Sequence, residues 1–112
     1  MAKHIGNKIV RFTGVTDLDD TPLSDWRGDY LGLPGMLCIY ESEHKVPGKR
    51  LVYFFPHEPD KEMQRYMHTT FGDYSESDGI ITLTSHHIYK FEIGDFLSED
   101  EHKILWLNAF LI

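Results

Sequence analysis

Short apolar runs alternate with turn signals along the chain, and the clearest pair of runs flanks residues 45–49. The run 36–40 reads Met-Leu-Cys-Ile-Tyr, and the run 51–55 reads Leu-Val-Tyr-Phe-Phe. Between them, Pro47 and Gly48 suit the centre of a type II turn, because proline presets φ and glycine accepts a positive φ. The run 51–55 contains no polar residue, which indicates a strand covered on both faces. We therefore expect a central β-hairpin over residues 36–56.

Three further segments have the composition and period of β-strands. They are residues 8–13, 80–84 and 88–93, and the last two form a second predicted hairpin that turns near Ser85 and His86. Within 88–93, apolar residues alternate with a lysine and a glutamate, so one face of that strand is expected to contact water. The polar segment 73–79 between the two hairpins is expected to be a loop.

A first helix is predicted between the two hairpins, beginning near Pro59. Proline fits the first helical position, and acidic residues just after it suit the positive end of the helix dipole. The apolar face of this helix would consist of side chains that recur at helical spacing, namely Met63, Tyr66, Met67 and Thr70. Gly72 is expected to end the helix in the left-handed conformation.

A second helix is predicted at the C-terminus, where Ser98 and Glu101 have the spacing of a capping box. After this start, residues 104–112 are apolar at every position except Asn108. One helix face cannot hold so many apolar side chains. The segment is therefore expected to be buried on more than one side, to be covered by a partner or to end in a strand, and it is a candidate homodimer contact.

These segments predict one α+β domain over residues 1–112, with the order β-β-β-α-β-β-α. We expect a mostly antiparallel sheet of about five strands, able to curl towards a small barrel, with two helices on one face, because the strand runs are too close for crossover connections. The apolar faces of the periodic segments predict the core, which is expected to contain Phe12, Ile39, Tyr53, Phe55, Met67, Leu83, Phe91, Ile93 and Leu105.

The composition is that of a globular protein and the charge is acidic. Of the 112 residues, 41% are hydrophobic, and the formal net charge is −7. Such a chain repels nucleic acid and attracts cationic partners. A single cysteine, an N-terminus without an apolar signal core and no long apolar run make the cytoplasm the expected location, with no membrane partner.

No catalytic or metal-binding motif is complete. The seven histidines include no HExxH pair, since Lys61 occupies the required position after His57. His86 and His87 are adjacent, so they can act together only in a turn. The acidic loop after Asp17 lacks the glycine and glutamate of a calcium-binding loop. We expect neither metal nor cofactor, and no catalytic residue is assigned, so a binding protein is favoured over an enzyme.

Two acidic loops that also carry aromatic rings are the candidate binding surface. The first lies in residues 14–35, which have no hydrophobic period and many glycines and prolines, and such long loops are often functional. Carboxylates steer a basic partner and rings anchor it. The partner-binding candidates are Asp17, Asp19, Asp20, Asp25, Trp26, Asp29 and Tyr30 in this loop and Asp73, Tyr74, Glu76 and Asp78 in the second. The competing interpretation is that the loops are acidic for solubility, with Trp26 and Tyr30 packed into the core.

The leading functional hypothesis is an acidic protein-binding domain that neutralises a basic partner by covering its active site. An immunity protein or inhibitor of a nuclease toxin fits the small size, the acidic charge and the missing catalytic motifs. One alternative is a small-ligand-binding or regulatory domain that uses the 14–35 loop as a lid. A second alternative is a small hydrolase whose histidine and aspartate cannot be paired from sequence spacing.

Overall fold

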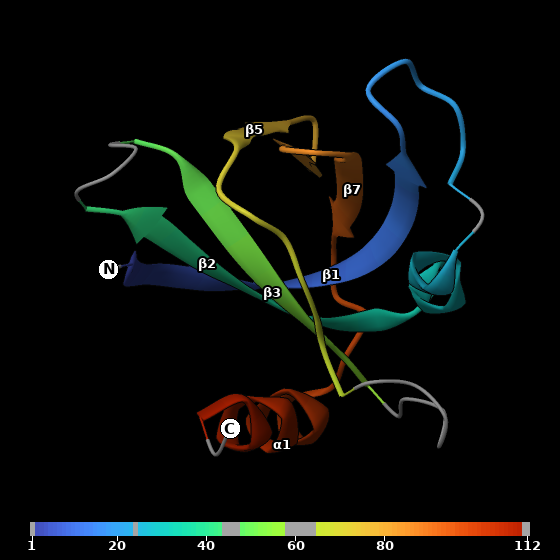
Figure 1. Ribbon diagram of the computed structural model, residues 1–112. Helices are drawn as coiled ribbons and strands as arrows, with labels where there is room; N and C mark the ends of the chain where they lie inside the picture. Colours follow the sequence, from blue (N-terminus) through green and yellow to red (C-terminus); the bar gives the residue numbers. More distant parts are fainter. Residues whose placement is uncertain (1, 24, 44–47, 58–64, 111–112) are drawn as a thin grey trace.

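The chain forms one curved antiparallel sheet with one α-helix against its outer face (Figure 1). The computed structural model describes residues 2–23, 25–43, 48–57 and 65–110. The seven strands lie across the sheet in the order β4-β3-β2-β1-β7-β6-β5. Their bounds are β1 Ala2–Thr16, β2 Pro34–Ser42, β3 Arg50–Pro56, β4 Met67–His68, β5 Asp73–Ser77, β6 Ile80–Thr84 and β7 Ile88–Ile93. A 3-10 helix, η1 (Trp26–Tyr30), follows β1, and α1 (Glu99–Phe110) ends the described chain.

Strand β1 lies at the centre of the sheet and pairs with a different neighbour along each half. Residues Ala2 to Arg11 pair with β2, and Val10 to Thr16 pair with β7. The register shifts once in each half, between His4 and Gly6 and between Phe12 and Gly14. Such bulges bend a strand and increase its twist. The two halves of the sheet therefore wrap around a common interior instead of lying flat.

The short connection from β4 to β5 crosses from one edge of the sheet to the other. Strand β4 pairs with β3, whereas β5 pairs with β6 at the opposite edge. On the way, Thr69 N–H donates to the carbonyl of Val52 at 3.0 Å. Gly72 and Arg50 then exchange two backbone hydrogen bonds of 2.8 and 3.0 Å. The sheet remains open, and this segment holds its two edges near each other.

The main core fills the concave side of the sheet. Three phenylalanines from three strands meet at its centre: the ring centroid of Phe12 lies 5.1 Å from that of Phe91 and 6.0 Å from that of Phe54. All three side chains are fully buried. Further buried residues surround them, namely Val10, Val15, Tyr30, Leu37, Ile39, Val52, Met67, Ile81, Leu83 and Tyr89.

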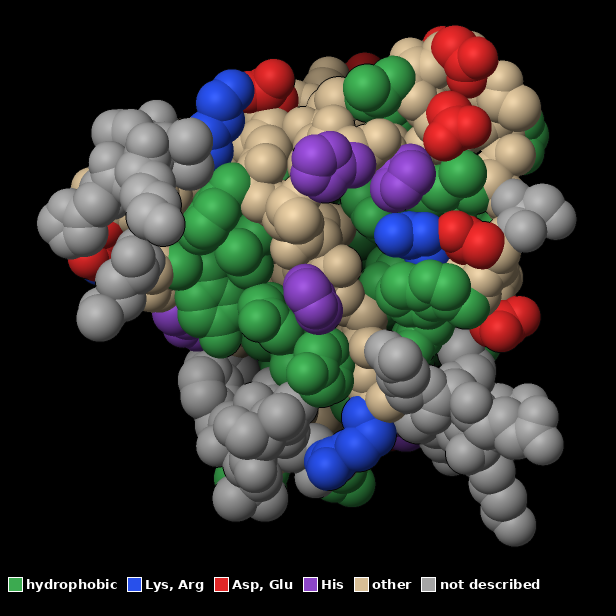
Figure 2. Space-filling model, in the orientation of Figure 1, with side chains coloured by type: hydrophobic (Ala, Val, Ile, Leu, Met, Phe, Trp, Pro, Cys, Tyr) green, Lys and Arg blue, Asp and Glu red, His purple; other side chains and the backbone are tan. Residues whose placement is uncertain are grey.

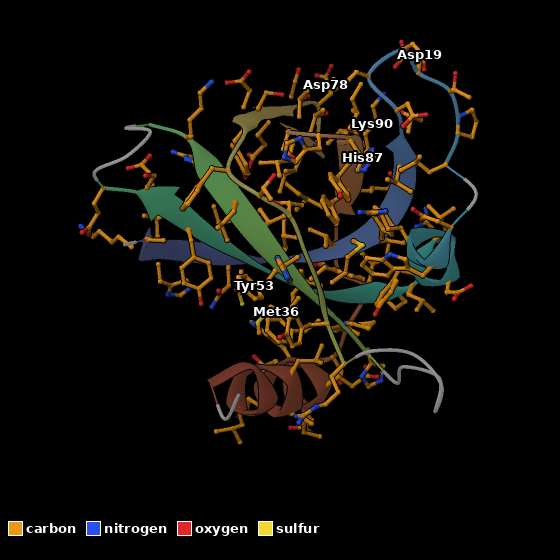
Figure 3. The ribbon with its side chains drawn as sticks, in the orientation of Figure 1. Asp19, Met36, Tyr53, Asp78, His87 and Lys90 are labelled. Carbon is orange, nitrogen blue, oxygen red and sulfur yellow. The ribbon has the colours of Figure 1, made fainter. Side chains whose placement is uncertain are left out.

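A second, smaller core lies between the outer face of the sheet and α1. Leu105 of α1 packs against Met36, Cys38 and Phe55, and Figure 3 shows Met36 in this layer. Strands β2 and β3 thus carry apolar side chains on both faces, as predicted for the run 51–55. Burial raises the pKa of the Cys38 thiol to about 11, so the thiol stays protonated at neutral pH and is a poor nucleophile.

Both predicted hairpins are confirmed. The central hairpin is β2 and β3, and Gly48 has the positive φ of 83° that the turn requires. The second hairpin is β6 and β7, turning at residues 85–87. The capping box is also present, since Ser98 N–H donates to Glu101 Oε1 at 2.9 Å and Glu101 N–H donates to Ser98 Oγ at 3.2 Å.

The first predicted helix is wrong where the structure describes it, and residues 58–64 lie outside the described residues. Met67 and His68 form β4, and Gly72 sits in a β-bridge, not at a left-handed helix end. Met67 and Thr69 are buried while His68 and Thr70 are exposed, which is the alternation of a strand. The predicted loop 73–79 is also wrong over its first part, because Asp73–Ser77 is the edge strand β5. The described residues accordingly form a mostly β domain with seven strands and one α-helix, where the sequence predicted about five strands and two helices.

Seven of the nine predicted core residues are buried, but Tyr53 and Ile93 are only half-buried. Tyr53 lies on the outer face of β3, where its ring centroid is 5.6 Å from that of Tyr40 and 5.5 Å from that of Tyr66. Of residues 104–112, Leu105 is buried while Ile104 and Leu107 are exposed. A homodimer contact through this segment stays a prediction. Among the described residues, no helix combines the length and the apolar character needed to cross a membrane.

Replacing the helix cap is expected to weaken the fold measurably. Ser98→Ala removes the acceptor for Glu101 N–H and should lower the free energy of unfolding by about 0.5–2 kcal/mol. The hydrogen bond from Ser98 N–H also lowers the pKa of Glu101, so the ionised carboxylate stabilises the fold at neutral pH and loses this effect as the pH falls below 4.5. Urea unfolding measures the change. Ser98→Asp keeps a capping oxygen and is the matched control, and equal losses for the two variants would contradict the capping role.

Candidate functional site

A hollow of about 420 Å³ opens on the face shown in Figure 2, where several histidines gather. Three segments that are distant in the sequence line it: the 14–35 loop, the end of β4 with the residues after it, and the β6–β7 turn with the start of β7. The lining residues are Trp26, Arg27, His68, Thr69, Thr70, Ser85, His86, His87 and Tyr89. The topology places them together because β4 and the β6–β7 turn both lie beside the connection that crosses between the sheet edges.

Arg27 is held at the wall of the hollow by three contacts. Asp25 caps η1 by accepting from Arg27 N–H at 2.9 Å, and its carboxylate forms an ion pair with the Arg27 guanidinium. The Nε of Arg27 donates to the Tyr89 hydroxyl at 3.1 Å. The guanidinium carbon lies 4.8 Å from the ring centroid of Trp26, within cation–π range. These contacts fix the 14–35 loop to β7.

His87 and Asp17 form a histidine–aspartate pair that the sequence spacing did not reveal. Their Nδ1 and Oδ1 atoms are 3.5 Å apart. The geometry is not that of a hydrogen bond, and the Nδ1 atom is buried without a hydrogen-bond partner in the described part of the chain. Figure 3 shows His87 on the side of the sheet away from α1.

The acidic tip (residues 17–21) is a tight, internally bonded turn beside the hollow. Asp17 N–H donates to the Thr21 carbonyl at 2.8 Å, and Asp20 N–H donates to the Asp17 carbonyl at 3.0 Å. Asp19 Oδ1 accepts from Thr21 N–H at 3.1 Å. Hydrogen bonding by the Thr21 side chain and, to a smaller extent, by its backbone N–H lowers the pKa of the Asp19 carboxyl. Leu18, at the apex, is 61% exposed. The tip thus presents carboxylates and an apolar side chain on a fixed frame.

The other predicted residues of the 14–35 loop have different environments. Trp26 is 45% exposed, and Asp29 is exposed on η1. Tyr30 is only 1% exposed and belongs to the main core, where its ring centroid lies 6.5 Å from that of Phe54. Burial of Tyr30 means that it cannot contribute to a partner-binding surface in this conformation. The interpretation that both rings pack into the core therefore holds for Tyr30 and not for Trp26.

Residues of the second acidic segment lie at both ends of β5. Asp73 forms an ion pair with Lys49 and lines a smaller hollow of about 290 Å³ that shares Thr70, Ser85 and His86 with the first. Five strand residues span about 15 Å, so Glu76 and Asp78 lie towards the far end of the hairpin. Glu76 is 3.9 Å from the Lys8 ammonium.

Tyr74 lies beneath a cation and is half-buried. The Arg50 guanidinium carbon is 4.7 Å from its ring centroid. Burial, with a smaller contribution from Glu76, raises the pKa of Tyr74 to about 12. The structure therefore gathers Asp17, Asp25 and Asp73 around the two hollows, while Tyr74, Glu76 and Asp78 follow β5 away from them.

Sequence reasoning missed Arg27 and the three histidines as members of one site. The adjacent pair His86 and His87 was the available signal, because in a turn both side chains can face the same space, and they do so here. Among the residues that the structure describes, no group of three histidine, cysteine or acidic side chains is close enough to hold a metal ion.

Comparisons with known proteins give no match: no family model fits the chain, and neither curated proteins nor solved structures show significant similarity to it.

Proposed function

We propose that the chain is an acidic protein-binding domain that neutralises a basic partner by covering its active site, with a nuclease toxin as the leading candidate partner. The observation that carries the proposal is the acidic tip. Leu18 is exposed between two aspartates of the chain, in a turn whose backbone hydrogen bonds fix its shape. A preformed tip loses little conformational freedom on binding, which favours affinity.

Apolar anchors are concentrated in the loop that carries the tip. Among the described residues, six large apolar side chains are exposed, and three of them, Leu18, Trp26 and Leu31, belong to residues 14–35. Protein interfaces commonly depend on a few such anchors surrounded by polar groups. This distribution supports a binding surface, since solubility alone would not place exposed leucines beside the aspartates.

The carboxylates differ in how available they are to a partner. Asp25 and Asp73 already form ion pairs within the domain. Asp19 and Asp20 form no ion pair with the described residues, and both are exposed. We therefore assign the first encounter with a basic partner to Asp19 and Asp20. In a nuclease they would occupy the position of substrate phosphates over a cleft lined by lysine and arginine.

Changes at the tip are expected to separate steering from anchoring. Asp19→Asn with Asp20→Asn should slow association with the partner by roughly tenfold at low salt, because charges steer the encounter. Leu18→Ala should mainly speed dissociation, by about tenfold or more if the side chain is a hot spot. The partner is first captured with the tagged chain from its native cells and purified. Association and dissociation rates are then measured in low and high salt.

Asp95→Asn is the matched control, because Asp95 is an exposed carboxylate outside the loop. It should leave both rates nearly unchanged. A partner that is acidic, that keeps its activity in the complex, or that binds independently of salt and of the tip variants would contradict the proposal. Loss of binding only with Glu76→Gln and Asp78→Asn would move the surface to the β5–β6 hairpin.

The hollow beside the tip favours a second candidate function, small-ligand binding beneath the 14–35 loop, since Trp26 and Arg27 of that loop line it.

A further inference from the structure

We propose that the hollow between η1 and the β6–β7 turn binds a small organic anion, a molecule with a carboxylate, sulfate or phosphate group on an apolar body. The inference rests on the donors that converge there and is independent of the partner proposed for the acidic tip. The volume of the hollow, about 420 Å³, lies within the range of small-molecule sites, which is roughly 300–1,000 Å³.

Arg27 supplies a fixed positive group at the wall. A guanidinium has five N–H donors, and the contacts with Tyr89 and Asp25 use those on Nε and Nη1. Nη2 makes no hydrogen bond with the described residues, and the side chain is 20% exposed. Since Trp26 and Tyr89 hold the group in place, an anion gains directional hydrogen bonds without having to order a mobile side chain.

The histidines add positive charge that depends on pH. His68, His86 and His87 all line the hollow, and a protonated imidazole donates from both ring nitrogens. His68 Nδ1 lies 3.3 Å from the carbonyl of Thr69, which favours a proton on that nitrogen. Thr70 and Ser85 add hydroxyl donors on the same wall. Every one of these groups can donate to an anionic ligand.

Carboxylates next to the hollow repel an anion, so its binding should depend on the protonation of the histidines. The charged and titratable groups that face the histidines are Asp17, Asp25, Arg27, Lys49, Asp73 and Tyr89. When the histidines are neutral, the charges of Arg27 and Lys49 are balanced by their paired aspartates, and Asp17 leaves the surroundings of the hollow with a net negative charge. Protonation of the three histidines makes this net charge positive. Affinity for an anion should therefore be higher when these histidines are protonated, that is, at lower pH.

Rings on the wall indicate a ligand with an apolar body. The indole of Trp26 and the ring of Tyr89 both line the hollow, and the rings of His87 and Tyr89 meet edge to face at 6.3 Å. An inorganic ion would leave most of this space unfilled. A flat group next to the anion would cover the rings and gain the burial energy of its apolar area.

The test uses sulfate and phenyl sulfate, whose charges stay constant between pH 5.5 and pH 8. Calorimetry should show phenyl sulfate binding roughly tenfold more tightly than sulfate, because its ring is buried. Binding of phenyl sulfate should strengthen by about tenfold or more from pH 8 to pH 5.5. In NMR spectra, adding phenyl sulfate should shift the ring resonances of His68, His86 and His87 and not those of His102 on α1.

Variants assign the effect to the hollow. His86→Gln combined with His87→Gln should abolish the pH dependence, and Arg27→Gln should weaken binding at every pH. His102→Gln is the matched control and should bind as the parent does. Thermal melting shows whether each variant is folded. If Arg27→Gln does not fold, the double histidine variant alone is sufficient for the test. Binding that is independent of pH, or that the double variant leaves unchanged, would overturn the proposal while leaving the partner hypothesis standing.

Discussion

Phe91→Ala is expected to lower the free energy of unfolding by about 3–5 kcal/mol, the range for truncating a buried phenylalanine. Phe91 is fully buried in β7, and its ring centroid lies 5.8 Å from that of Phe54 in β3 and 5.1 Å from that of Phe12 in β1. One side chain therefore joins the two halves of the curved sheet. Its removal leaves a cavity that both halves line and that neither can fill alone.

Ile104→Ala on α1 provides the comparison for this core substitution. Ile104 is 56% exposed, so its truncation should change the free energy of unfolding by about 0.5 kcal/mol or less. Equilibrium urea unfolding, followed by circular dichroism, measures both variants. A loss below about 1 kcal/mol for Phe91→Ala would mean that the phenylalanine cluster does not link the two halves of the sheet.

Elements with local signals were predictable from the sequence. The predicted second strand of the central hairpin coincides with β3, because an apolar run and a Pro-Gly turn are both encoded within a few residues. The start of α1 was predictable for the same reason, since both capping-box contacts are made between residues three apart. Strand Asp73–Ser77 carries four polar or charged residues out of five, and it forms because β6 offers it a free edge. That edge lies outside the segment's own sequence.

Helical spacing misled the prediction for residues 65–72 because it competed with a strand pattern over the same residues. Met67 and Thr69 point into the protein and Thr69 Oγ1 accepts from Val52 N–H at 3.1 Å, which is a contact made across a long sequence separation. Such contacts override local propensity, and a single sequence does not display them. The same kind of contact accounts for β4 and β5, the two strands that were not predicted.

The candidate site also has one part that the sequence predicts and another that it does not. Clustered aspartates made the acidic tip visible, since Asp17, Asp19 and Asp20 are neighbours in the chain. The hollow was not visible, because Arg27 and Tyr89 meet only after β1 and β7 have paired. Tyr30 shows the opposite case: it lies among the loop aspartates in sequence, yet its ring is drawn into the main core.

Gly72→Ala is expected to destabilise the protein by at least about 2 kcal/mol, towards the upper part of the range for overpacked sites. A Cβ at this position would overlap the carbonyl oxygen of Thr84 and lie 2.8 Å from its carbonyl carbon. Those atoms belong to β6 and cannot rotate away as a side chain would. The backbone of Gly72 is itself bonded to Arg50 in both directions, so neither side can yield without breaking sheet hydrogen bonds.

Two further variants decide why glycine is needed at position 72. Gly6→Ala is the matched control, because a Cβ there meets no atom within 4 Å, and it should change stability by about 1 kcal/mol or less. Gly72→Asn separates the two explanations, since asparagine is accepted at a left-handed helix end but is too large for a close approach to Thr84. We expect Gly72→Asn to destabilise at least as much as Gly72→Ala in urea unfolding. If the asparagine variant is as stable as the parent, glycine is needed for a left-handed helix end. That result would contradict the explanation from the bridge that joins β3 to the β5–β6 hairpin.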